Sequence, residues 1–199
     1  AEGGKREQTW HFPSRAECTL CHTMSAKYAL GVNTLQLNKD HTYGAVVANQ
    51  LSTFAHLGLF TRALPQPPEQ LPRIVDYRDE SQPIHLRARS YLHSNCAHCH
   101  QKWGGGNADF QTLARLPADK MGVIETRPGQ GLFGLTDPRV IVPGDPVRSL
   151  VTHRMQKTGL GRMPHVGSNV VDAQGVEVVT RWIESLALPG ETQKTGVVP

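Results

Sequence analysis

The sequence predicts an all-α fold of two small domains with long loops. Apolar residues recur at helical spacing in several segments, and no segment shows the strict alternation that is typical of a strand. A proline-rich segment, Leu64–Pro72, holds four prolines in nine residues, so it is expected to be an extended linker rather than a helix. We therefore expect a first domain over residues 1–70, a linker region over 71–82 and a second domain over 83–199.

Two helices are predicted in the first half of the chain. The first runs from Ser14 to Leu30, and Pro13 marks its start. The second runs from Tyr43 or Val46 to Phe60. Its apolar side would carry Val47, Leu51, Phe54 and Leu57 or Gly58.

The second half is predicted to begin and end with helices. The first of these runs from Pro83 to Gln101, and the glycine run at residues 104–106 stops regular structure after it. Residues 117–148 are rich in glycine and proline, so they are expected to form a loop.

The clearest helix in the chain is predicted from Val171 to Leu186. Asp172 is expected to be its N-cap, and Pro189-Gly190 is expected to end it. Its apolar stripe consists of Val176, Val179, Ile183 and Leu186, and Trp182 lies beside the stripe.

All four cysteines of the chain lie in two copies of C-x-x-C-H, which are Cys18-Thr-Leu-Cys21-His22 and Cys96-Ala-His-Cys99-His100. This spacing is typical of c-type haem attachment. Two thiols three positions apart can reach the two vinyl groups of one porphyrin, and the adjacent histidine then lies beneath the iron. The sequence therefore predicts two covalently bound haem c groups, with Cys18, Cys21, Cys96 and Cys99 as attachment residues and His22 and His100 as iron ligands. His98 is expected to be only the variable position within its motif.

Other functions of paired cysteines remain as alternatives. A thioredoxin-like redox motif normally lies beside a βαβ pattern, and none is visible here. One zinc site made by both pairs would need a shorter separation than that between Cys21 and Cys96, and it would not explain the histidines. Structural disulfides between the pairs stay open in an oxidising compartment.

The second motif is expected to have a methionine on the far side of its iron, because Met with His is a common ligand pair in electron-transfer haems. Met121, Met155 and Met163 are the methionines of this half. We favour Met163, because Pro164 after it keeps the backbone extended in a loop. Met155 lies in a helical pattern, where methionine ordinarily fills core space.

The sixth ligand of the first haem is less clear from the sequence. Met24 is too close to His22 to reach the opposite haem face. We favour His56, which lies on the predicted helix ending at Phe60. His41, an open position and a donor from the other domain are the alternatives.

Residues 83–188 resemble a class I cytochrome c domain, in which a helix, C-x-x-C-H, loops, a Met-Pro segment and a crossing terminal helix follow in order. This resemblance implies that His100 and Met163 bind iron and that Tyr91 or a neighbour packs against Trp182 or Ile183. The longer pattern, including residues 30–38 and 49–58, is similar to uncharacterised bacterial dihaem proteins. The first haem domain departs from the class I pattern and is expected to be atypical.

Composition excludes some classes of partner. The formal charge of +4 comes from scattered Lys and Arg rather than from a basic stripe, so no nucleic-acid partner is expected. No apolar stretch is long enough to span a bilayer, so the chain is not expected to be membrane-spanning. No signal peptide is present at Ala1, which is consistent with a processed N-terminus or a fragment of a longer chain.

The function predicted from these features is that of a periplasmic or otherwise exported dihaem c-type cytochrome, an electron carrier rather than an enzyme. Its partners would be redox proteins, including a periplasmic dehydrogenase or a membrane electron-transfer complex. The alternative is a haem enzyme, peroxidase-like or a small-molecule reductase, with an open sixth position at the first haem.

Overall fold

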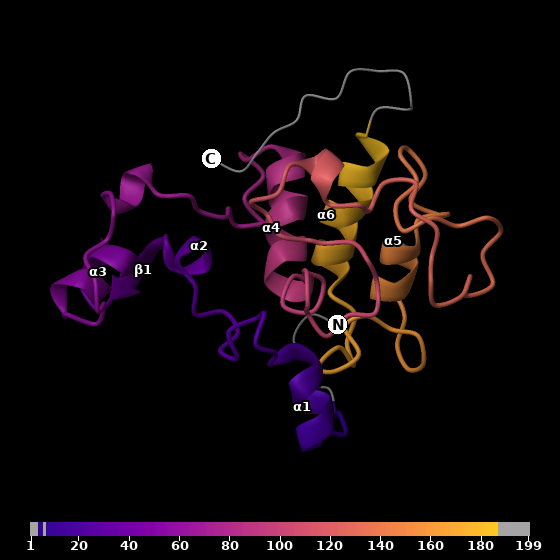
Figure 1. Cartoon of the computed structure of the whole chain (residues 1–199), viewed down its shortest axis with the longest axis horizontal. Helices are drawn as coiled ribbons and strands as arrows, with labels where there is room; N and C mark the ends of the chain where they lie inside the picture. Colours follow the sequence, from indigo (N-terminus) through magenta and orange to yellow (C-terminus); the bar gives the residue numbers. More distant parts are fainter. Residues whose placement is uncertain (1–3, 6, 187–199) are drawn as a thin grey trace.

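A computed structural model of the chain describes residues 4–5 and 7–186 (Figure 1). Between its regular elements the chain forms mostly turns and loops. The elements in chain order are α1 (Arg15–Cys21), α2 (Thr34–Leu37), β1 (Asp40–Tyr43), β2 (Val46–Asn49), α3 (Gln50–His56), α4 (Ile84–Cys96), α5 (Leu150–Met155) and α6 (Ala173–Glu184), with 3₁₀ turns at Pro68–Gln70 and Ala118–Lys120.

The predicted all-α fold of two cytochrome-like domains is wrong as a fold class, because residues 40–49 form an antiparallel hairpin. The strands pair from Asp40 opposite Asn49 to Tyr43 opposite Val46. The turn includes Gly44 at φ +64°, a conformation that glycine adopts without steric cost. All of β1 and the first half of β2 are exposed, so these strands lack the apolar alternation by which a sequence reveals a half-buried strand.

The helix predicted over this region is correspondingly shorter. It begins at Gln50 rather than at Tyr43 or Val46, and it ends at His56 rather than at Phe60. The Asn49 side chain accepts hydrogen bonds from the backbone N–H groups of Leu51 and Ser52, which caps the helix at this point.

The first cysteine motif lies at the end of a helix much shorter than the predicted one. The helix α1 ends at Cys21, whereas the prediction extended to Leu30. The start of α1 agrees with the prediction, since Ser14 is its N-cap. Ser14 and Glu17 form a capping box, which fixes the helix start at this point.

The two predicted helices of the second half are present with shorter bounds. Pro83 precedes the first residue of α4, which ends at Cys96 rather than at Gln101. The N-cap prediction for Asp172 is confirmed, since its side chain accepts a hydrogen bond from the backbone N–H of Gly175. The predicted stop at Pro189-Gly190 lies outside the described residues.

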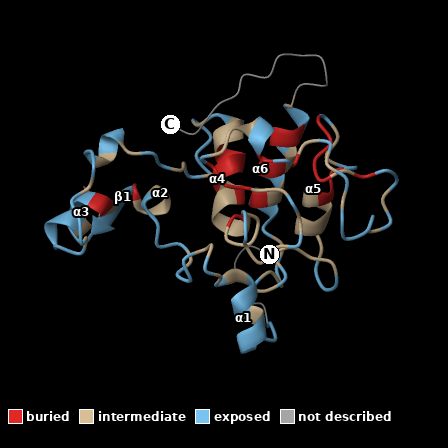
Figure 2. Cartoon of the chain, viewed as in Figure 1, coloured by how far each residue is buried: buried red, intermediate tan, exposed pale blue. Residues whose placement is uncertain are grey.

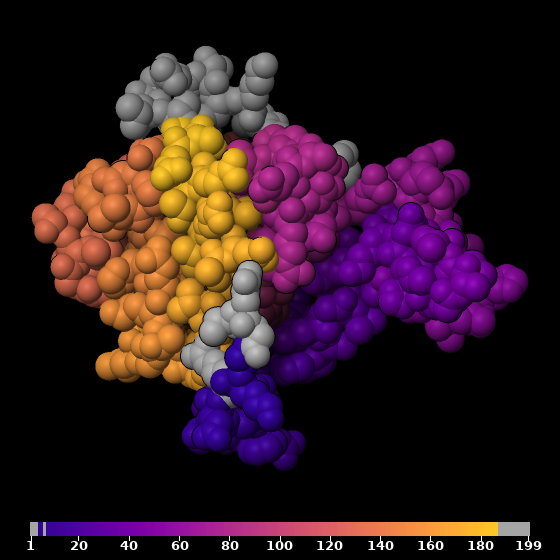
Figure 3. All heavy atoms as spheres, turned by 180° about the vertical axis from the view of Figure 1, so that it is seen from behind, coloured from indigo at the N-terminus to yellow at the C-terminus, as the bar shows by residue number. Residues whose placement is uncertain are grey.

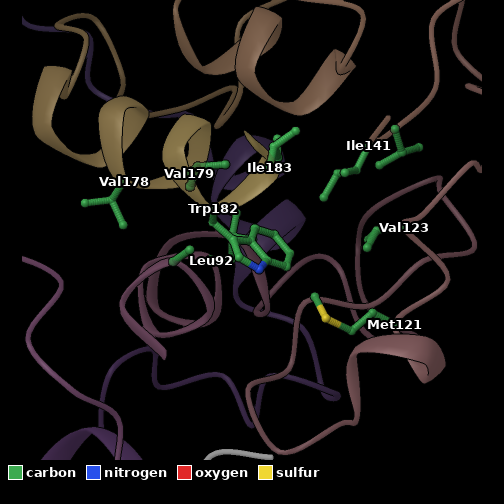
Figure 4. Close-up of a cluster of buried hydrophobic side chains, with 10 residues drawn as sticks. Leu92, Met121, Val123, Ile141, Val178, Val179, Trp182 and Ile183 are labelled. Carbon is green, nitrogen blue, oxygen red and sulfur yellow. The ribbon is translucent and has the colours of Figure 1, made fainter. Parts of the chain in front are cut away.

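The hydrophobic core is built from the second half of the chain (Figure 2). Trp182 of α6 lies in the middle of the side chains labelled in Figure 4. The cluster comprises Ala88, Leu92, Met121, Val123, Val140, Ile141, Val178, Val179, Trp182 and Ile183.

The N-terminal part has almost no core of its own. Among the described residues before Ile84, only Asn38 and Leu51 are buried. Seen from behind, the indigo and purple segments project from the body that the rest of the chain forms (Figure 3). The division into two haem domains stays a prediction.

The helices α4 and α6 pack directly against each other. The Tyr91 ring on α4 occupies the space beside Gly175 on α6, where an added Cβ would overlap the ring atoms. Tyr77 packs edge-on against the same ring, with 5.0 Å between centroids. Its hydroxyl donates a hydrogen bond to the Asp172 carboxylate over 3.2 Å, which ties the start of α6 to the chain that precedes α4.

In the part of the chain that the structure describes, every helix is too short or too polar to cross a lipid bilayer.

Replacing Gly175 with alanine is expected to destabilise the protein. The new methyl would press on the Tyr91 ring, which Tyr77 restrains, and overpacking of this kind costs about 1–3 kcal/mol. The gain in helix propensity offsets at most about 1 kcal/mol. Urea unfolding followed by circular dichroism measures the net loss. The matched control is Gly129→Ala, because a Cβ there meets nothing within 4 Å. Equal stability of the two variants would contradict this packing.

Candidate functional site

Each C-x-x-C-H motif is presented at the C-terminal end of a helix. In the first motif, both cysteines lie in α1 and His22 is its C-cap. In the second, Cys96 is the last residue of α4, and the chain then turns tightly. The backbone N–H groups of Cys99 and His100 donate to the Cys96 carbonyl over 3.1 and 2.8 Å. This turn places the second thiol and the histidine beyond the helix end.

The two motifs meet, although 78 residues separate Cys21 from Cys99. The Cys99 thiol lies 3.5 Å from Cys21 Sγ and donates to the Leu20 carbonyl over 3.1 Å. The segments that follow the two motifs are also in contact. The Ser25 hydroxyl, three residues after His22, donates a hydrogen bond to the Trp103 carbonyl, three residues after His100, over 2.5 Å. The structure therefore joins the two predicted attachment segments at one place.

A glycine makes this close approach sterically allowed. A Cβ on Gly105 would overlap the carbonyl group of Leu20, which is backbone and has little freedom to move. The sequence indicated only that residues 104–106 interrupt regular structure. In the folded chain, the absence of a side chain at Gly105 also lets the Leu20 carbonyl, near the end of α1, lie against the backbone of Gly105.

The contact between Cys21 and Cys99 shifts the pKa values of the two thiols in opposite directions. Accepting hydrogen bonds from Cys99 and then from His98 lowers the pKa of Cys21. The hydrogen bond to Cys21, followed by burial, raises the pKa of Cys99. Burial alone raises the pKa of Cys96 to about 12. Of these three thiols, Cys21 is therefore the one that carries the anion most readily.

The histidine of the first motif is oriented by a backbone carbonyl. His22 Nδ1 lies 2.5 Å from the Tyr28 carbonyl oxygen, so Nδ1 carries the hydrogen and Nε2 keeps its lone pair. A hydrogen bond from one ring nitrogen to a carbonyl is the usual arrangement for a histidine that binds metal through the other nitrogen.

The histidine of the second motif is packed more tightly. Its ring stacks on Phe110, with 4.4 Å between centroids and 9° between planes. Nδ1 is buried without a hydrogen-bond partner among the described residues, and a Cβ on Gly106 would lie 3.1 Å from it. Burial, followed by the charges of Arg154, His98 and His165, lowers the pKa of His100 to about 4. The ring is therefore neutral near pH 7, which is the form that ligates metals.

The methionines of the second half differ in their surroundings. Met121 is only 1% exposed within the hydrophobic core, and Met155 packs against that core as expected of a filler residue. Met163 lies in the loop between α5 and α6, where its N–H donates to the Arg154 carbonyl over 3.1 Å. His165 of this loop and Arg154 near the end of α5 both act electrostatically on His100, so both segments lie on the side of the second motif.

The structure does not bring His56 or His41 to the first motif. His56 is exposed at the last position of α3, and His41 is exposed on β1 beside Tyr43. Figure 1 draws α3 and β1 well apart from α1. The assignment of His56 as an iron ligand stays a prediction, and its place in the fold adds no support.

One residue of the site was missed by sequence reasoning. His98, taken there as a variable position, offers a ring nitrogen beside two thiols. The ligand atoms of Cys21, His98 and Cys99 all lie within 4.8 Å of one another, which makes this a candidate metal site among the described residues. No local pattern could have revealed it, because Cys21 comes from the other motif.

The residues present suit a c-type haem at each motif. Each offers two thiols and one imidazole, and both imidazoles turn Nδ1 toward the protein, which leaves Nε2 for iron. Comparisons with protein families, with curated proteins and with solved structures give no match for this chain. The resemblance to class I cytochrome c and to bacterial dihaem proteins therefore stays a prediction from the sequence.

Proposed function

We propose that this protein is a dihaem c-type cytochrome that transfers electrons between redox partners in the periplasm or in another exported location. The observation that carries the proposal is the use of all four cysteines in two C-x-x-C-H motifs. Cys18 and Cys21 would hold one haem, and Cys96 and Cys99 the other. Haem iron supplies one-electron redox chemistry when it is bound.

The side chains around the motifs support a large apolar cofactor. Trp103 is 80% exposed and Met24 is 76% exposed, and Leu20 and Tyr28 are also exposed. These four residues lie within a few positions of one or the other motif in the sequence, and large exposed apolar side chains beside a site are candidates for contact with a ligand. A porphyrin would cover such residues and would add apolar contact to a part of the chain in which, among the described residues before Ile84, only Asn38 and Leu51 are buried.

The contact between the motifs supports exchange of electrons between the two sites. Because Cys21 Sγ lies 3.5 Å from Cys99 Sγ, groups attached to these sulfurs would be neighbours. His22 and His100 would each bind one iron, and Met163 would complete the second site. The external partners would be redox proteins, including a periplasmic dehydrogenase or a membrane electron-transfer complex.

A count of haems tests the proposal directly. The chain, exported in a host that attaches haem c, is expected to give two haems per polypeptide in the pyridine haemochrome assay. The double variants Cys18→Ala/Cys21→Ala and Cys96→Ala/Cys99→Ala should each retain one haem. Absence of covalent haem from the exported, folded chain would overturn the proposal.

Met163→Leu is expected to change the spin state of one haem, about half of the iron, because leucine has no donor atom. The ferric visible and electron paramagnetic resonance spectra should show this fraction becoming high-spin. Met155→Leu is the matched control, because Met155 packs against the core, and it should leave the spectra unaltered. If Met163→Leu also leaves them unaltered, the ligand is another residue.

A second candidate function is small-molecule binding at the first haem, as in a peroxidase-like enzyme or a reductase. The exposed positions of His56 and His41, away from α1, favour an open sixth site there. The ferric protein would then be partly high-spin and would bind about one cyanide per chain. His56→Ala should leave this spectrum unchanged. A fully low-spin protein that gains a high-spin fraction in His56→Ala would instead identify His56 as the ligand and exclude the open site.

A further inference from the structure

The cluster of Cys21, His98 and Cys99 has the composition and spacing of a transition-metal site in its own right. Two thiols and one imidazole place their ligand atoms within 4.8 Å of one another. A zinc–sulfur bond is about 2.3 Å, so two thiolates on one tetrahedral ion lie about 3.8 Å apart. The 3.5 Å between Cys21 Sγ and Cys99 Sγ is close to that value.

The donor types select the class of ion. Thiolates and imidazole suit zinc and other borderline-soft divalent cations, whereas calcium and magnesium require oxygen ligands. Three protein ligands leave the fourth tetrahedral position to water. Both sulfurs bind as thiolates, so any thiol proton that they still hold passes to solvent, and no oxidant or reductant is needed because zinc does not change its oxidation state.

The site is built between the motifs rather than within either of them. Cys18 and Cys96, the other cysteine of each pair, do not belong to the cluster. Its formation depends on Gly105, which admits the Leu20 carbonyl beside the second motif. A metal bound by one C-x-x-C pair alone would use Cys18 with Cys21, or Cys96 with Cys99.

Haem attachment would consume two of the three ligands. Each thiol adds across a vinyl double bond, so that sulfur bonds to one carbon and its hydrogen passes to the other. The resulting thioether has no proton to lose and cannot become a thiolate. Metal bound at the cluster and haem attached at Cys21 and Cys99 are therefore alternatives for the same sulfur atoms.

We propose that the haem-free chain binds one zinc-class divalent cation through Cys21, His98 and Cys99, and that this metal and covalent haem exclude each other. The exclusion rests on the proposed haem function, whereas the metal site itself does not. The buried hydrophobic core against which Cys96 of the second motif packs consists of side chains from residues 88–183.

Cobalt titration of the reduced, haem-free 199-residue chain tests the site. Co²⁺ occupies tetrahedral zinc sites and gives a thiolate charge-transfer band with intense visible bands. We expect about one Co²⁺ per chain. Cys21→Ser and Cys99→Ser should each weaken binding by more than the about 10–100-fold that loss of an outer-shell partner costs. His98→Gln should weaken binding and change the visible bands.

Cys18→Ser and Cys96→Ser are the matched controls, because each removes a cysteine of the same motifs while sparing the cluster. They should keep both affinity and spectrum. If Cys18→Ser or Cys96→Ser loses the band as Cys21→Ser does, the metal is held within one motif and the proposal is wrong. Gly105→Ala keeps all three ligands but should weaken cobalt binding, because its Cβ would push the two motifs apart. Its circular dichroism spectrum should stay unchanged. Full cobalt affinity in this variant would likewise contradict a site built between the motifs.

The haem count separates failure of this site from failure of the proposed function. If the exported chain attaches haem but the haem-free chain does not bind cobalt, the metal-site proposal alone is wrong. If cobalt binds with the expected pattern among the variants but no haem is attached, the cytochrome proposal is wrong and the metal-site proposal is supported. When haem is attached, the holoprotein should show no cobalt thiolate band, and a band at the wild-type intensity would refute the exclusion.

Discussion

The Tyr91 ring of α4 fills the space beside Gly175 of α6, and the position of the second cysteine motif depends on this packing. Because α4 ends at Cys96, whatever holds α4 against α6 also holds the second motif at the surface of the core. The tight turn after Cys96 then sets the positions of Cys99 and His100. In the part of the chain that the structure describes, the first motif has no comparable core beneath it, and it lies against the second through the Leu20 carbonyl and Gly105.

The histidines of the two motifs are therefore held in place by different kinds of contact. His100 is held by the Phe110 ring and by close packing at Nδ1, so its orientation is set by tertiary contacts. His22 is exposed, and among the described residues its hydrogen-bond partner is the Tyr28 carbonyl six residues further along. A cofactor at the first motif would therefore contribute more to local structure than one at the second, where a hydrophobic core already exists.

Sequence reasoning succeeded where the controlling interactions are local. Pro13 predicted where the first helix begins and Asp172 predicted the N-cap of the last one, because helix starts are set within one turn; the capping box of Ser14 and Glu17 is seen only in the structure. It failed for the hairpin at residues 40–49, because exposed strands carry no apolar alternation. It also extended α1 well past Cys21, since nothing in the residues after the motif excludes further helix.

The sequence by itself determined the chemistry available to this protein, namely four thiols and two histidines at C-x-x-C-H spacing, because neighbours three or four positions apart are close in any fold. Only the tertiary structure decided which thiols share a site. Cys21 and Cys99 are 78 positions apart in the sequence, and the absence of a side chain at Gly105 lets the end of α1 lie against the second motif, which follows α4. Such proximity depends on long-range packing, which leaves no trace in local spacing.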